Sequence, residues 1–153
     1  MVAVDNTQMR NFTRRKAPGF PYKEIAETIL PGWDISLVFS GTTRARNLNI
    51  ALRKKNYVPN VLSYEVGKKS GEIIICLEVA EKQAQSYGLS YKHFVVFLFI
   101  HGLLHLKGLP HGTTMEKHEQ TFFTLFTGRH FSYDVEPFNS SVNYGSSTHR
   151  NRN

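Results

Sequence analysis

The sequence has one cysteine, Cys76, and lacks any apolar run long enough to cross a membrane. A single cysteine excludes a disulfide framework, a cysteine-based zinc ribbon and an iron–sulfur cluster, and it is typical of a reducing compartment. The longest apolar run, residues 94–106, is shorter than the roughly 20 residues of a membrane helix and contains two histidines. The N-terminal residues lack the apolar segment of a secretory signal. We therefore expect a cytoplasmic protein with no membrane partner.

Acidic residues are also scarce, since 12 Asp and Glu stand against 19 Lys and Arg and the net charge is +7. An excess of this kind favours contact with a polyanion. The chain of 153 residues is 41% hydrophobic, which suffices for one core without disulfides or a structural metal. A metal site in such a chain would therefore serve function rather than folding.

Apolar periodicity and turn residues predict the order of the helices and strands. Alternation over residues 33–39 predicts a half-buried strand that turns Asp34, Ser36 and Val38 away from the core. Most strands precede the long helices, so we predict an α+β fold in which a small mixed sheet, four-stranded in type, packs against several helices. The expected helices are 21–30, 44–55, 79–87, 91–106 and 114–126, and the expected strands are 33–39, 60–66 and 72–77.

Three histidines stand at metal-ligand spacing in and after the expected helix 91–106. His101 and His105 are four residues apart, which places them on one helix face about 5–6 Å apart at Cβ. Gly108 lets the chain leave the helix through a left-handed conformation and return His111 to the same point. Three imidazoles with an open fourth position are typical of catalytic zinc. The alternative without a metal is that His101 and His105 are two hydrogen-bonded histidines of the core.

We therefore predict a metal site on this helix and the following turn, formed by His101, His105 and His111, that holds one zinc ion per chain. Other divalent transition metals fit the same ligands, because affinity order alone does not select zinc. The spacing also equals that of the metzincin proteases, H-E-x-x-H-x-x-G-x-x-H, whose glutamate is the general base. Gly102 occupies that position here, so a protease of this mechanism lacks its base.

The same segment carries a more specific resemblance. Residues 101–111, HGLLHLKGLPH, resemble the signature H-G-x-L-H-L-x-G-x-D-H of the YbeY family of metal-dependent endoribonucleases. Further blocks resemble the family motifs L-N-x-x-[YW]-R, P-T-N-V-L-S-F and G-D-I, in the same order: LNIALR at 48–53, NVLSY at 60–64 and GEIII at 71–75. The resemblance implies a YbeY-like metallohydrolase domain at 17–131. Outside it, the composition predicts a basic N-terminal segment at 1–16 and a poorly ordered Ser/Asn-rich tail at 132–153.

The resemblance implies a zinc-dependent endoribonuclease that cleaves single-stranded RNA. It further implies maturation of the tail of small-subunit rRNA, ribosome quality control, and the small ribosomal subunit as a partner. Arg53 matches the arginine of the family's second motif and is the expected catalytic residue, because a guanidinium holds phosphate oxygens as charge builds on them. An isolated helix arginine would ordinarily be a solvated charge, so only the motif favours this role.

Other basic residues flank these motifs and could contact the phosphates of a single strand, although charged helix faces are usually just solvated. They are Arg44, Arg46, Lys54, Lys55, Lys68 and Lys69. Tyr57 and Tyr64 are candidates for base stacking or for ordinary packing.

Two other functions stay open. One is the zincin-like metalloprotease without its glutamate. The other is a non-catalytic, ribosome-associated metal-binding factor, because Pro110 stands where the family has an aspartate.

Overall fold

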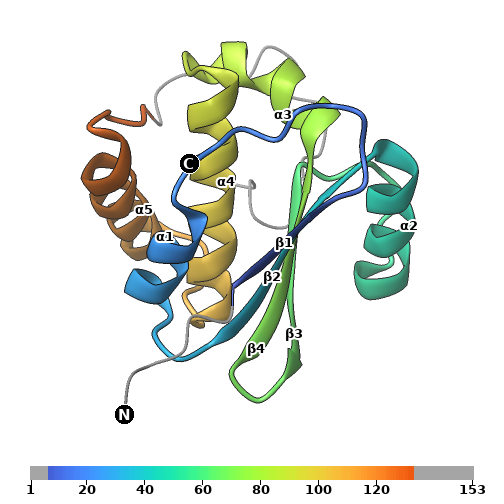
Figure 1. Ribbon diagram of the computed structural model, residues 1–153, viewed down its shortest axis with the longest axis horizontal. Coiled ribbons are helices and arrows are strands. Elements are labelled where there is room, and N and C mark those ends of the chain that lie inside the picture. The colour runs from blue at the N-terminus through green and yellow to red at the C-terminus, as the bar shows by residue number, and fades with distance from the viewer. Residues whose placement is uncertain (1–6, 133–153) are drawn as a thin grey trace.

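The computed structural model describes residues 7–132 and contains a mixed four-stranded sheet with helices on both faces (Figure 1). This confirms the predicted α+β class. The tail expected at 132–153 lies, from residue 133, outside the described residues. The elements are β1 (Gln8–Asn11), α1 (Tyr22–Ile29), β2 (Asp34–Ser40), α2 (Thr42–Arg53), β3 (Val61–Gly67), β4 (Ser70–Cys76), α3 (Leu77–Ala84), the 3-10 turn η1 (Gln85–Tyr87), α4 (Tyr91–Leu106) and α5 (Thr113–Thr127).

The sheet has the strand order β1-β2-β4-β3. The strands β1, β2 and β4 run parallel, and β3 pairs antiparallel with β4 through the tight turn after Gly67. Helices α1, α3, α4 and α5 cover one face, and α2 lies alone on the other (Figure 1). The last strand in this order, β3, is therefore an edge strand.

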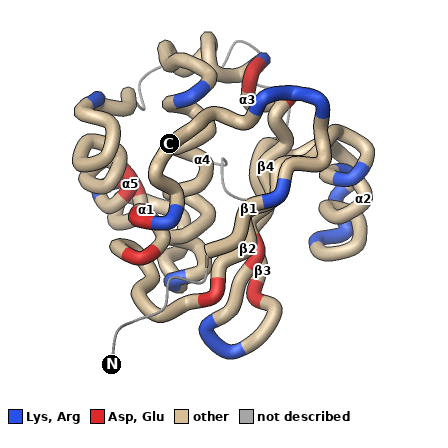
Figure 2. The backbone as a smooth tube through the Cα atoms, in the orientation of Figure 1, with Lys and Arg blue, Asp and Glu red and all other residues tan. Residues whose placement is uncertain are grey.

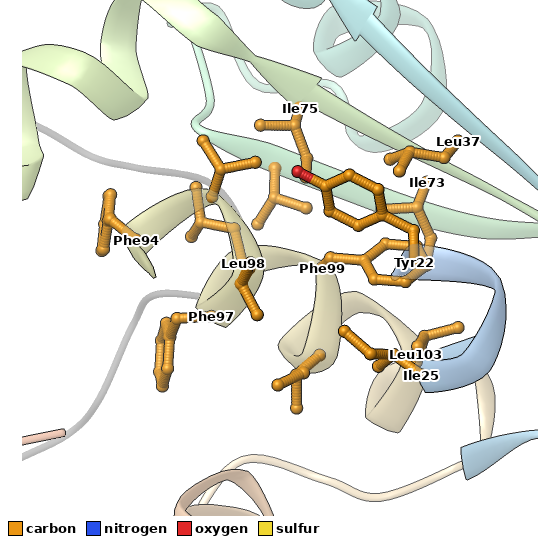
Figure 3. Packing of buried hydrophobic residues seen from close by; sticks show 14 of the residues in the cluster. Tyr22, Ile25, Leu37, Ile73, Ile75, Phe94, Phe97, Leu98, Phe99 and Leu103 are labelled. Carbon is orange, nitrogen blue, oxygen red and sulfur yellow. The ribbon is translucent and has the colours of Figure 1, made fainter. Parts of the chain in front are cut away.

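Helix α4 is the centre of the fold. Every residue from Phe94 to Leu104 is buried, which explains why the sequence is apolar all round this helix instead of on one stripe. Its start is capped by Ser90, whose Oγ accepts a hydrogen bond from the backbone N–H of His93 at 3.1 Å, as the sequence predicts. Figure 3 shows α4 side chains packed against those of the sheet and of α1.

The strand β2 differs from its expected half-burial. Leu37 and Phe39 face the large core, but Val38 is also buried, at 6% exposure. Val38 packs with Leu62 and Ile74 under α2. The prediction was wrong because the period-2 pattern of one strand does not reveal that a helix covers its second face.

The strand β1 lies within residues 1–16, the segment that the sequence distinguishes by its basic charge. Gln8–Asn11 pairs in parallel with Ser36–Phe39 of β2, although its own four side chains are exposed. Main-chain hydrogen bonds, which leave no hydropathy signal, therefore attach this polar strand to the sheet.

No single helix among residues 7–132 has the length and apolar composition of a membrane span. One pair of consecutive helical segments has both when counted together, but the two meet at 105°: Leu77–Tyr87 and Tyr91–Leu106.

Candidate metal centre

The three predicted histidines come together at the C-terminal end of α4. One ring nitrogen from each of His101, His105 and His111 lies within 4.8 Å of the other two. The ring centroid of His105 lies 4.6 Å from that of His101 and 4.5 Å from that of His111. The chain returns His111 through Gly108, whose φ of +101° is the left-handed conformation expected after the helix. The geometry fits one metal ion bound by three imidazoles.

The three rings span a gradient of exposure from the core to the surface. His101 is buried at 1% exposure, His105 is half-buried, and His111 is exposed. A metal ion bound by all three rings would therefore be held from the core side by His101 and would be accessible to solvent on the side of His111. This is the arrangement that leaves a coordination position for water or substrate.

The buried ring of His101 has a carboxylate partner that the sequence reasoning missed. Nδ1 of His101 is hydrogen-bonded to Oε2 of Glu119, a fully buried residue on α5. Such a bond fixes the orientation of the ring and makes Nε2 the nitrogen that His101 offers to a metal. A signal was present, because Met115, Glu119 and Phe123 are four residues apart on the buried face of α5.

The half-buried ring of His105 is suited to metal binding. Burial, together with the neighbouring His101 and His111, lowers the pKa of His105 to about 3. The imidazole is therefore neutral at physiological pH, which is the form that binds metal. Its Nε2 is buried and has no hydrogen-bond partner within residues 7–132. A bound metal ion would satisfy this atom, so the residues present fit a metal.

Arg53 lies at the end of α2 in a small polar network. Its Nη1 donates to Oδ1 of Asn49 at 3.1 Å and to the hydroxyl oxygen of Tyr57 at 3.0 Å. Asn49 is fully buried, and its Nδ2 donates to the backbone oxygen of Tyr57 at 3.1 Å. Two side chains therefore hold one arginine nitrogen. Arg53 is also close enough to His105 for its charge to lower the pKa of that ring.

A pocket of about 240 Å³ opens beside His105. Its other walls are Leu106 of α4 and Ser63, Tyr64 and Glu65 of β3. The pocket therefore joins one of the three histidines, His105, to the edge strand β3. The sequence does not predict this contact, because β3 and α4 are far apart along the chain.

Gly102 faces the sheet instead of the histidine cluster. A Cβ atom at this position would lie 3.0 Å from Cγ2 of Ile73 on β4. The glycine therefore allows α4 to pack closely on the sheet, and a larger residue would push against the side chain of Ile73. A glutamate base would have no room at this position, which argues against the metzincin alternative.

The remaining sequence candidates are dispersed. Lys68 and Lys69 occupy the β3–β4 turn, and further Lys and Arg lie along α2 (Figure 2). The guanidinium of Arg44 lies over the ring of Phe12, with its Cζ 4.2 Å from the ring centroid. Tyr64 packs against the cluster under α2, whereas the hydroxyl of Tyr57 is the one bonded to Arg53.

The chain matches the model of one known family, described as Endoribonuclease YbeY, over residues 3–125. Three similar proteins carry that same description. A Mesoplasma florum protein is 32% identical over 69% of this chain and 66% of its own length. A Persephonella marina protein is 33% identical over 67% of this chain and 75% of its own length. A Polynucleobacter asymbioticus protein is 41% identical over 50% of this chain and 52% of its own length. The chain therefore spans about half to three quarters of the curated relatives that it matches.

A solved structure has a related fold. The solution structure of TM1509 from Thermotoga maritima superimposes with a TM-score of 0.53, covering 69% of this chain and 76% of that one. The sequences are 21% identical, so this likeness supports the fold alone.

Proposed function

This chain belongs to the YbeY family, and from that premise we propose that it is a metal-dependent endoribonuclease. The observation that carries the proposal is the convergence of three imidazoles beside a buried carboxylate, with an arginine close enough for its charge to act on His105. The relatives' description as endoribonucleases supplies the substrate class.

In this proposal His101, His105 and His111 hold one divalent ion, for which zinc is the first candidate because three neutral imidazoles suit it. When bound, the metal supplies Lewis-acid stabilisation of a phosphoryl oxygen and lowers the pKa of a coordinated water. Glu119 keeps the His101 ring in the orientation that its ligand role requires. Burial keeps His105 neutral and ready to bind.

Arg53 is the proposed catalytic residue. Its guanidinium would hold the scissile phosphate as negative charge accumulates on the phosphate oxygens. Asn49 and Tyr57 restrict the guanidinium to one orientation, which lowers the entropic cost of binding the phosphate. The nearby positive charge also explains why a polyanionic strand would be drawn to this side of the molecule.

We further propose the RNA and the setting that the family resemblance implies. The substrate would be single-stranded rRNA, in particular the tail of small-subunit rRNA, and the protein would act in the cytoplasm in ribosome maturation and quality control. The small ribosomal subunit would then be its partner. The excess of 19 basic over 12 acidic residues is consistent with such a substrate.

The decisive experiment measures metal content and RNA cleavage together. Purified protein should contain about one zinc per chain and should cleave a labelled rRNA precursor, and a chelator should abolish cleavage while leaving the fold intact. His105→Ala should lose both metal and activity. RNA binding that survives chelation, with no cleavage under any divalent metal, would instead identify a non-catalytic factor, the alternative that Pro110 keeps open.

A further inference from the structure

The free edge of β3 borders the proposed catalytic centre. The backbone N–H of Cys76 donates to the backbone oxygen of Asn60 at 2.9 Å, directly before the paired residues Val61 and Ile75. In an antiparallel pair, bonded and non-bonded positions alternate. The backbone groups of Leu62 and Tyr64 therefore point toward β4, and those of Ser63 and Glu65 point outward from the sheet.

The side chains of Ser63 and Glu65 share the face of the sheet that α4 covers. Leu62 and Tyr64 pack under α2, on the opposite face, and side chains alternate along a strand. Ser63 and Glu65, with their outward-facing backbone groups, thus line the pocket of about 240 Å³ beside His105 from the face that α4 covers. This wall has hydrogen-bonding groups but no positive charge.

The groups near His105 differ in charge. The positive charge of Arg53 acts on His105, whereas the pocket is lined by Glu65 and, among residues 7–132, by no lysine or arginine. A carboxylate repels a phosphate but accepts hydrogen bonds from the amino group of a nucleobase. Leu106 adds only a small apolar surface, because it is buried at 6% exposure. The wall is therefore complementary to a nucleoside and not to the backbone of an RNA strand.

We propose that this pocket binds the nucleobase adjacent to the scissile phosphate and that Glu65 makes it selective for bases with an exocyclic amino group. This inference rests on the proposed endoribonuclease function. Single-stranded RNA is commonly recognised through unstacked bases whose edges are hydrogen-bonded in this way. Adenine, cytosine and guanine carry an exocyclic amino group, and uracil does not.

The test uses the full chain loaded with zinc and a set of single-stranded oligoribonucleotides that differ in the one base on either side of the cleaved bond. For the wild type, kcat/KM should be about tenfold higher when the base next to the cleaved bond carries an amino group than when it is uracil. A tenfold difference corresponds to about one good hydrogen-bonded base contact. Glu65→Gln should remove most of this preference, because its amide can donate to O4 of uracil as well as accept from an amino group, so cleavage next to uracil should rise toward that next to the other bases. Asp34→Asn, which removes an exposed carboxylate at the start of β2, is the matched control and should keep the preference.

A second variant and a binding measurement separate this inference from the proposed function. Ser63→Val keeps a good strand residue but fills part of the pocket, so it should weaken cleavage of every sequence without loss of zinc. Fluorescence anisotropy with the same oligonucleotides, carrying a 2′-O-methyl ribose and a methylphosphonate linkage at the cleavage site, measures the base preference without turnover, because neither water nor a 2′-hydroxyl can cleave that linkage readily.

A preference in binding with no cleavage would refute the proposed function and retain the base pocket. Equal affinities for all four bases, or a preference that Glu65→Gln leaves unchanged, would overturn the base pocket while cleavage continues.

Discussion

The two faces of the sheet differ in the size of the buried apolar cluster that covers them, and they contribute different residues to the site. We call the face with the large cluster the deep face and the face under α2 the shallow face. On one face, α1, α3, α4 and α5 enclose a large cluster of buried apolar residues that reaches His101. On the other, α2 covers only the small cluster of Val38, Leu62 and Ile74, with Leu48 and Tyr64 against it. The metal ligands come from the deep face, and Arg53 comes from the shallow one.

This difference indicates how each group is held in place. Aromatic packing and a buried carboxylate surround His101, so the core fixes its position. Arg53 has no such core behind it, and hydrogen bonds from its side chain to Asn49 and Tyr57 position it instead. We therefore expect apolar substitutions on the deep face to cost more stability than those on the shallow face, where loss of Arg53 should cost activity without unfolding the protein.

Phe97→Ala should have the largest effect and would test whether the deep face carries the stability. The ring of Phe97 is buried at 1% exposure and stacks on Phe131, with 3.8 Å between ring centroids. Removing it should lower the free energy of unfolding by about 3–5 kcal/mol, because the cavity cannot close fully. Urea denaturation measures this. Leu48→Ala, on the half-buried shallow face, should cost about 1 kcal/mol, and equal costs would contradict the comparison.

Arg53→Ala should separate activity from stability on the shallow face. We expect RNA cleavage to fall about 10²–10³-fold, the usual cost of removing a group that stabilises charge in the transition state. Zinc content should be unchanged, since Arg53 is not a ligand. Arg53→Lys keeps the charge but loses the forked geometry and should restore only part of the rate. Cleavage by Arg53→Ala at the wild-type rate would refute the assigned role.

Glu119→Gln should weaken the metal site from its buried side. The amide has nearly the same shape but a weaker hydrogen bond to Nδ1 of His101, so zinc affinity should fall about 10–100-fold. Competition with a coloured chelator measures this directly. Glu24→Gln, on the exposed first turn of α1, provides the control. An unchanged affinity would mean that Glu119 supports the core and not the metal.

Tyr57→Phe should have the smallest effect. The change removes one hydroxyl that accepts a hydrogen bond from Arg53, which should cost about 0.5–1.5 kcal/mol, or about 2- to 12-fold in cleavage rate. Because Tyr57 acts through Arg53, the loss should vanish in an Arg53→Ala background. Tyr91→Phe removes a hydroxyl bonded to the backbone oxygen of Lys16, remote from the network, and should leave cleavage unchanged. Additive losses in the double variant would contradict a positioning role.

Much of the fold could be predicted because its signals are local. The Ser90 cap, the turn after Gly67 and the helical spacing of His101 and His105 all depend on residues a few positions apart. The expected helix 114–126 corresponds to α5 (Thr113–Thr127) within one residue at each end. The burial of Val38 was missed because it depends on α2, which follows in the chain but packs across the sheet.

The candidate site divides in the same way. The sequence by itself determined the three histidines and their common side of a helix end, since periodicity and one glycine suffice to bring them together. Three further contacts become visible only in the folded protein: Glu119 supports His101, Gly102 faces Ile73, and the edge strand β3 lines a pocket beside His105. These contacts join separate elements, and their geometry follows from how the helices and the sheet pack, which no local pattern contains.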